Sequence, residues 1–101
     1  MRVNLVESKH EGDVWFIFVG VDTFEEFDLI ADIIVSSGAV NIKTLDGIYS
    51  RFGFFEKSGL LFKLVYHEDV GNYLCLSEKG GDYNRLRNLA QKIAELLLVR
   101  V

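Results

Sequence analysis

The sequence predicts an α+β domain in which a mainly antiparallel sheet of about six strands carries two helices on one face. Between residues 40 and 77, four strand-like segments rich in aromatic and aliphatic residues follow one another with only short polar turns between them. On either side of this run lies a segment with apolar residues at helical spacing. Half of the 101 residues are hydrophobic, which is enough for one packed core, and no internal repeat divides the chain. We therefore expect a single domain over residues 1–101, with its elements in the order ββαββββα.

A β-hairpin is expected first. Residues from Arg2 to Glu7 alternate between apolar and polar side chains, and the polar segment 8–13 can form a turn. The second strand, Val14 to Val19, is apolar at every position. A strand of this kind either lies in the middle of a sheet or has both of its faces covered.

The first helix is expected over roughly residues 23–37. Asp22 or Thr23 can cap its start, with Glu25 or Glu26 three residues later as the partner in a capping box, and a glycine follows its last turn. One face of this helix is apolar, which predicts that it packs on the sheet. That face consists of Phe24, Phe27, Ile30, Ala31 and Ile34.

A four-stranded meander follows the first helix. Strands at residues 40–45 and 48–56 are joined by Asp46-Gly47, a pair that is typical of two-residue hairpin turns. Strands at 60–67 and 72–77 come after short turns that contain glycine.

The second helix is expected over roughly residues 83–98, with Asp82 as its cap after two glycines. Its apolar stripe predicts that it also packs on the sheet. The stripe consists of Tyr83, Leu86, Leu89, Ala90, Ile93 and Leu97. Its basic residues are Arg85, Arg87, Lys92 and Arg100.

Alternation along the meander sorts its side chains onto two faces. The side chains expected to face the helices are Phe52, Phe54, Leu60, Phe62, Leu64, Leu74 and Leu76. Those expected on the opposite face are Tyr49, Arg51, Phe55, Lys63, His67, Tyr73 and Cys75. Three aromatic residues are more than a solvated face needs, so they either pack against the N-terminal hairpin or form a binding surface.

The net charge of −4 comes from one segment of the chain. Five carboxylates lie between residues 22 and 37 with no lysine or arginine among them, which leaves ten acids against eleven bases elsewhere. These five are Asp22, Glu25, Glu26, Asp28 and Asp32. They can form ordinary surface ion pairs with the basic residues of the second helix, or they can form an acidic patch that attracts a basic partner.

Two segments resemble the aromatic motifs of the RNA-recognition domain family. Ile17-Phe18-Val19-Gly20 resembles the first ribonucleoprotein motif, Thr23-Phe24-Glu25-Glu26 opens a helix where that family has one, and Ser50-Arg51-Phe52-Gly53-Phe54-Phe55 resembles the second motif. The resemblance implies aromatic side chains that stack on RNA bases. The chain departs from the family at Arg51, where a glycine is expected, and in its acidic charge, and a hairpin follows the aromatic strand where the family has a helix. These departures place RNA binding third among the functions considered.

No catalytic, cofactor or metal signature occurs in the sequence. His10 and His67 are far apart in the chain, and the single cysteine, Cys75, would need a nearby histidine to act as a nucleophile. Neither a Gly-x-Ser-x-Gly motif nor a phosphate-binding glycine loop is present. We therefore expect a protein that is not an enzyme and that binds neither a cofactor nor a metal.

The chain is expected to be cytoplasmic and not to enter a membrane. Its longest apolar runs are Val14–Val19 and Leu96–Val99, far short of the roughly 20 residues that span a bilayer. The N-terminal segment lacks the apolar core of a secretory signal, and a single cysteine cannot form an internal disulfide.

A short, acidic, single-domain α+β chain without catalytic residues resembles the immunity proteins of bacterial contact-dependent growth inhibition, whose usual partners are basic nuclease toxins. The resemblance implies a protein-binding module that covers the substrate cleft of a cognate toxin. Two sets of residues are candidates for the contact: Glu25, Asp28 and Asp32 on the first helix, and Tyr49, Phe55 and Tyr73 on the sheet. The alternative is a homo-oligomeric structural domain, such as a homodimer, joined through the same sheet face or an exposed edge strand.

Overall fold

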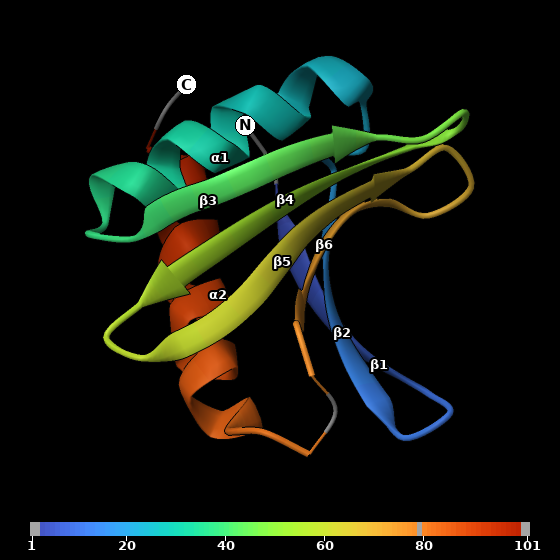
Figure 1. The fold of residues 1–101 in the computed structure, drawn as a ribbon. Coiled ribbons are helices and arrows are strands. Elements are labelled where there is room, and N and C mark those ends of the chain that lie inside the picture. Colours follow the sequence, from blue (N-terminus) through green and yellow to red (C-terminus); the bar gives the residue numbers. More distant parts are fainter. Residues whose placement is uncertain (1–2, 79, 100–101) are drawn as a thin grey trace.

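The computed structural model describes residues 3–78 and 80–99 and confirms the predicted α+β arrangement (Figure 1). A six-stranded antiparallel sheet carries two helices, in the predicted element order. The elements are β1 (Asn4–His10), β2 (Asp13–Val19), α1 (Phe24–Ser36), β3 (Val40–Asp46), β4 (Ser50–Lys57), β5 (Leu60–His67), β6 (Gly71–Leu76) and α2 (Tyr83–Leu98). Arg2, in the predicted first strand, and Arg100, in the predicted basic set of the second helix, lie outside the described residues.

The strands follow the order β1-β2-β6-β5-β4-β3 across the sheet. β3 to β6 form the predicted meander, and β6 then pairs with β2, which joins the N-terminal hairpin to the sheet. The register of β2 with β6 covers only Phe16↔Leu74 and Ile17↔Tyr73, and Figure 1 shows the β1–β2 hairpin diverging from β3–β5 at one end. β2 lies inside the sheet, as its continuous apolar sequence predicts, and β1 and β3 are the edges.

Both helices begin with a side-chain cap. Thr23 Oγ1 accepts a hydrogen bond from the Glu26 backbone N–H (3.2 Å), and the Glu26 carboxylate accepts one from the Thr23 backbone N–H (3.1 Å), which completes the predicted capping box. Asp82 caps α2 by accepting from the Arg85 backbone N–H (3.1 Å). The apolar sides of both helices pack on one face of the sheet and enclose the main core. Over the residues described, neither helix is long and apolar enough to cross a bilayer.

The predicted faces are confirmed for β5 and β6. Side chains from both strands line the main core: Leu60, Phe62, Leu64, Leu74 and Leu76. Tyr73 and Cys75 lie on the other side of the sheet, which no helix covers and which is called the open face below.

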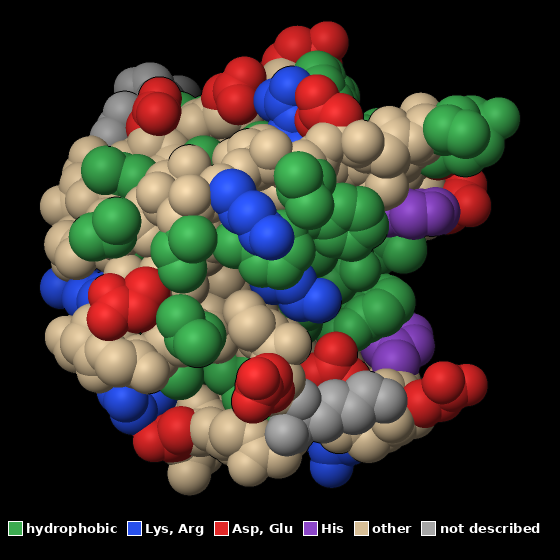
Figure 2. All heavy atoms as spheres, in the orientation of Figure 1, with side chains coloured by type: hydrophobic (Ala, Val, Ile, Leu, Met, Phe, Trp, Pro, Cys, Tyr) green, Lys and Arg blue, Asp and Glu red, His purple; other side chains and the backbone are tan. Residues whose placement is uncertain are grey.

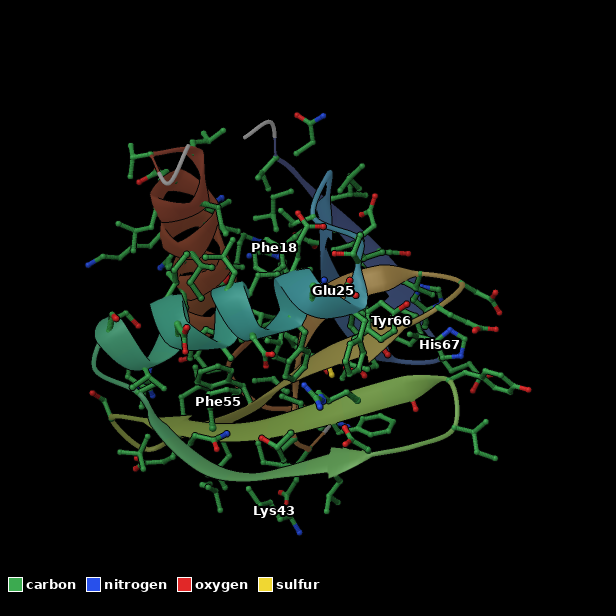
Figure 3. The ribbon with its side chains drawn as sticks, turned by 90° about the horizontal axis from the view of Figure 1, so that it is seen from above. Phe18, Glu25, Lys43, Phe55, Tyr66 and His67 are labelled. Carbon is green, nitrogen blue, oxygen red and sulfur yellow. The ribbon has the colours of Figure 1, made fainter. Side chains whose placement is uncertain are left out.

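The prediction for β4 is wrong, because its side chains face the opposite way. Phe55 is 1% exposed and lies in the main core, whereas Phe52 packs on the open face and Phe54 shares that face by alternation. Figure 3 shows Phe55 pointing towards α1 and Lys43 on the opposite side of the sheet. Arg51 accordingly lies on the helix side of β4.

Gly53 explains this orientation of β4. A Cβ atom at Gly53 would lie 2.9 Å from the Phe55 ring and 3.2 Å from the Phe27 ring of α1. Only glycine leaves room for α1 to pack this close to the strand, so the residues that share its face must turn towards the helix. Three phenylalanines within four positions are apolar on both faces, and alternation alone therefore could not decide the orientation.

The predicted two-residue turn at Asp46-Gly47 is also wrong. The Gly47 N–H donates to the Ser50 carbonyl oxygen (2.8 Å), which makes residues 48–49 the centre of the turn. The turn that favours an Asp-Gly pair needs positive φ at both residues, and neither residue has it. The observed register places Asp46 opposite Arg51, where the Arg51 Nε donates to the Asp46 carboxylate (2.6 Å).

Asn72 ties the sheet to the segment that leads into α1. It is the one polar residue that is buried in the described part of the chain, and it is fully buried. Its Nδ2 donates to the carbonyl oxygens of Val21 (2.7 Å) and Thr23 (3.0 Å). These two bonds fix where α1 begins and therefore where its first residue, Phe24, is placed.

Candidate functional site

The outer face of α1 carries the predicted acidic residues. Glu25, Asp28 and Asp32 are all exposed and lie three or four residues apart, so they share one side of the helix. Asp28 is engaged: its carboxylate accepts a hydrogen bond from Arg51 Nη1 (3.3 Å). Over the described residues, no ion pair involves Glu25 or Asp32. Most of the negative charge on this face is therefore available to a partner.

The described residues of the two helices are not joined by ion pairs. The basic residue of α2 that forms an ion pair is Arg87, whose Nε donates to the Glu7 carboxylate of β1 (2.8 Å). The acids of α1 are thus not neutralised by the described bases of α2, which was the alternative to an acidic patch.

A groove of about 400 Å³ opens where α1 begins, beside the β3–β4 turn and the end of β5. Three aromatic side chains, an isoleucine and two carboxylates supply most of its walls. The residues that define this hairpin-end groove are Phe24, Asp46, Gly47, Ile48, Tyr49, Ser50, Tyr66 and Glu68. Figure 3 shows Tyr66 beside the N-terminal end of α1, where Glu25 lies. The groove thus adjoins the acidic face of the helix.

The walls of the hairpin-end groove are held in place by contacts between segments far apart in the sequence. The Glu68 N–H donates to the Tyr49 carbonyl oxygen (3.1 Å), which ties the β5–β6 turn to the β3–β4 turn. The rings of Phe24 and Tyr66 meet edge to face with their centroids 5.6 Å apart. The Arg51 guanidinium lies over the Phe24 ring at 4.4 Å. The groove is therefore formed before any partner binds.

The potential around the groove is negative. The hydrogen bond from Arg51 lowers the pKa of Asp46 below its ordinary value, so this carboxylate stays ionised at neutral pH, and the same bond raises the pKa of Arg51. Arg51 is one positive charge among three carboxylates, because Asp28 also pairs with it and Glu68 lines the groove. This arrangement of charges attracts a cation.

The edge strand β3 adds an apolar surface beside the groove. All seven of its residues are exposed. The large apolar side chains of β3 and of the turn after it are 50–90% exposed; they are Val40, Ile42, Leu45, Ile48 and Tyr49, called the β3 edge below. Figure 2 shows apolar side chains standing out from the molecule at the tip of the β3–β4 turn. Such a surface beside a charged rim is typical of a protein-binding site.

The open face of the sheet holds a separate aromatic cluster. Trp15 stacks on Tyr73 with ring centroids 4.3 Å apart, and His10 stacks on the other side of Trp15 at 3.9 Å. Tyr73 is consequently only 8% exposed, and burial raises its pKa to about 12. Tyr73 therefore packs against the N-terminal hairpin, which is one of the two alternatives that the sequence left open for the aromatic residues of this face.

Cys75 belongs to the same cluster and is 2% exposed. Burial raises the pKa of Cys75 to about 11, so the thiol stays protonated at neutral pH. A protonated, buried thiol is a poor nucleophile.

The structure separates the six residues predicted to bind a partner. Glu25, Asp28 and Asp32 lie on the outer face of α1, and Tyr49 lines the groove at its N-terminal end. Tyr73 lies under Trp15 on the open face. Phe55 was predicted wrongly: it stacks on Phe62 inside the core (5.6 Å between ring centroids), because Gly53 turns it towards α1. The three residues of the predicted sheet set therefore do not form one surface.

Of the eight residues that line the groove, only Tyr49 was among the predicted site residues, so sequence reasoning missed the other seven. Phe24 was expected on the apolar face of the first helix, and only the pairing of distant segments places it beside Tyr66 in the wall of a groove. Phe18, the aromatic residue of the segment that resembles a ribonucleoprotein motif, is fully buried and cannot stack on a base.

No group of three or more potential metal ligands occurs among residues 3–78 and 80–99. Comparisons of the chain with protein-family models, with curated proteins and with solved structures found no match.

Proposed function

We propose that this protein is a protein-binding module that recognises a basic partner, most concretely a cytoplasmic immunity protein that neutralises a cognate nuclease toxin by covering its substrate cleft. The observation that carries the proposal is the position of the exposed, apolar β3 edge next to the acidic face of α1. The two surfaces are linked through Arg51, which contacts Asp28 of α1 and Asp46 of β3.

The two parts of this surface suit different stages of binding. Unpaired carboxylates on α1 attract a basic protein over a distance and speed its encounter. Exposed apolar side chains such as Ile48 and Tyr49 can then be buried at the centre of the contact, where most of the binding free energy arises. Occlusion of a cleft needs no catalytic group.

Co-expression tests the proposal. The chain is expressed together with the product of its upstream neighbouring gene, and the two are passed over a size-exclusion column. We expect a stable one-to-one complex and relief of the toxicity that the partner causes when expressed alone. Separate elution of the two proteins, together with unrelieved toxicity, would contradict the immunity role.

Charge reversal on α1 tests which surface is used. Glu25→Lys combined with Asp32→Lys is expected to raise the dissociation constant for the basic partner by about 10-fold or more, mainly through a slower association rate. Asp28 is left in place because its substitution would also disturb Arg51. The matched control is Glu78→Lys combined with Glu95→Lys, which changes the net charge equally at exposed positions outside α1. Equal loss of affinity in both double variants would show that only net charge matters.

A homodimer through β3 is the second candidate, because β3 is an edge strand whose residues are all exposed. The strand carries features that hinder extension of the sheet: its register shifts between Asn41 and Lys43, and the Asn41 side chain donates to the Phe54 carbonyl oxygen (3.2 Å). A monomeric mass in light scattering at high protein concentration would remove this candidate.

A further inference from the structure

The geometry points to a specific occupant of the hairpin-end groove: an arginine side chain of the partner protein. This inference rests on the proposed function, because it names the group that a basic partner would insert. The groove is about 400 Å³ in volume, and none of its eight lining residues is basic. Its walls combine aromatic rings with carboxylates, which are the two kinds of group that bind a guanidinium.

The protein's own Arg51 shows how these walls bind a guanidinium. It lies over the ring of Phe24 at 4.4 Å and donates through Nε to the Asp46 carboxylate at 2.6 Å. Phe24 and Asp46 are also groove residues, so the groove shares two of its walls with a site that already holds an arginine. One guanidinium does not balance the carboxylates around it, since Asp28 and Glu68 add two further negative charges.

The remaining walls can take a second guanidinium. Tyr49 and Tyr66 supply aromatic surface, and Glu68 supplies a carboxylate. Tyr49 is 60% exposed, so it is accessible to a ligand. The backbone bond between Glu68 and Tyr49 holds these two walls together. A planar cation can therefore lie against an aromatic ring while a carboxylate accepts its hydrogen bonds.

Arginine fits this site better than lysine. A guanidinium is planar, stacks on aromatic rings and donates two parallel hydrogen bonds to one carboxylate, whereas an ammonium is compact and more strongly hydrated. The expected order of affinity is arginine, then lysine, with an uncharged side chain of the same shape far weaker.

The test is a titration of the ¹⁵N-labelled protein with N-acetyl-L-arginine methylamide, followed by amide chemical shifts. We expect saturable shifts at residues 46–50 and 66–68, with a dissociation constant on the order of 1 mM, as befits one side chain without the rest of its protein. The citrulline analogue has nearly the same shape but no charge, and it should bind at least about 10-fold more weakly. Sodium chloride at the same concentration serves as the reference for ionic strength.

Substitution of Glu68 sharpens the test. Glu68→Gln keeps the shape and the backbone bond to Tyr49 but removes a charge, and it should weaken binding of the arginine probe several-fold, while the control Glu78→Gln should leave it unchanged. Equal binding of the arginine and citrulline probes, or shifts confined to other parts of the chain, would overturn the inference.

The failure of this inference can be told apart from failure of the proposed function. A partner that binds Glu68→Gln as tightly as the unmodified protein, with no saturable binding of the probe, would remove the arginine site and leave the protein-binding role. Saturable, charge-dependent binding of the probe without any complex in co-expression would support the arginine site and remove the protein-binding role.

Discussion

Asn72→Asp is expected to destabilise the protein by about 3–5 kcal/mol at neutral pH, which is the usual cost of leaving a buried charge without a partner. Asn72 is fully buried, and its Nδ2 donates to the carbonyl oxygens of Val21 and Thr23. An aspartate cannot donate when ionised, so it would place a negative charge against two carbonyl oxygens. Urea unfolding followed by circular dichroism measures the loss.

The pH dependence of the stability of this variant shows whether the loss comes from the introduced charge or from the lost hydrogen bonds. Burial without donors raises the pKa of the introduced aspartate in the folded state above its unfolded value of about 3.9. The folded variant therefore holds its proton more tightly than the unfolded chain, so its loss of stability relative to the unmodified protein is smallest below about pH 4 and grows as the pH rises. Asn72→Ala loses the same two hydrogen bonds without gaining a charge, and its deficit should not change with pH. Equal deficits for both variants at pH 7 would contradict the role given to the Asn72 amide.

Phe55→Ala is expected to cost about 3–5 kcal/mol of unfolding free energy, as truncation of a buried phenylalanine usually does. Phe55 is 1% exposed and packs between Phe62 and the ring of Phe27 above Gly53. The cavity left by its removal lies between β4 and α1, where the structure has little freedom to collapse. Urea unfolding again provides the measurement.

The neighbouring Phe54 is the matched control. It lies on the open face, is only partly buried and carries Lys43 Nζ above its ring at 5.0 Å. Phe54→Ala should therefore cost about 1 kcal/mol, as for a residue with a partly solvated side chain. The sequence predicted the reverse order, with Phe54 inside and Phe55 outside. A larger loss for Phe54→Ala than for Phe55→Ala would show that the observed orientation of β4 is wrong.

The elements whose local signals agree with one another could be predicted from the sequence. The capping box of Thr23 with Glu26 and the apolar spacing that follows it define α1, and Asp82 with its apolar stripe defines α2. β5 was placed at its observed bounds because glycine turns flank a clear alternation. In each case the residues that begin the element, its apolar periodicity and the residues that end it lie within one stretch of chain.

The orientation of β4 and the register of its turn depend on contacts that the sequence does not show. The direction of the β4 side chains follows from the close approach of Phe27 to Gly53, two residues 26 positions apart. The turn follows from the bond between Asp46 and Arg51, which outweighs the local preference of the Asp-Gly pair.

The candidate site could be predicted only in part, because it too depends on contacts between segments that are distant in the sequence. The acidic residues of α1 could be found because they are neighbours in the sequence. The hairpin-end groove could not, because Phe24, the turn at 46–50 and Tyr66 come together only when β3 to β6 pair and Asn72 fixes the start of α1. No local pattern encodes such a juxtaposition.

Amide hydrogen exchange of the complex with the basic partner locates the binding surface without any substitution. We expect partner binding to slow exchange at residues 22–28, 40–50 and 66–68, which contain the acidic start of α1, the β3 edge and the groove. Protection confined to α2, or to the β1–β2 hairpin around Trp15, would contradict it.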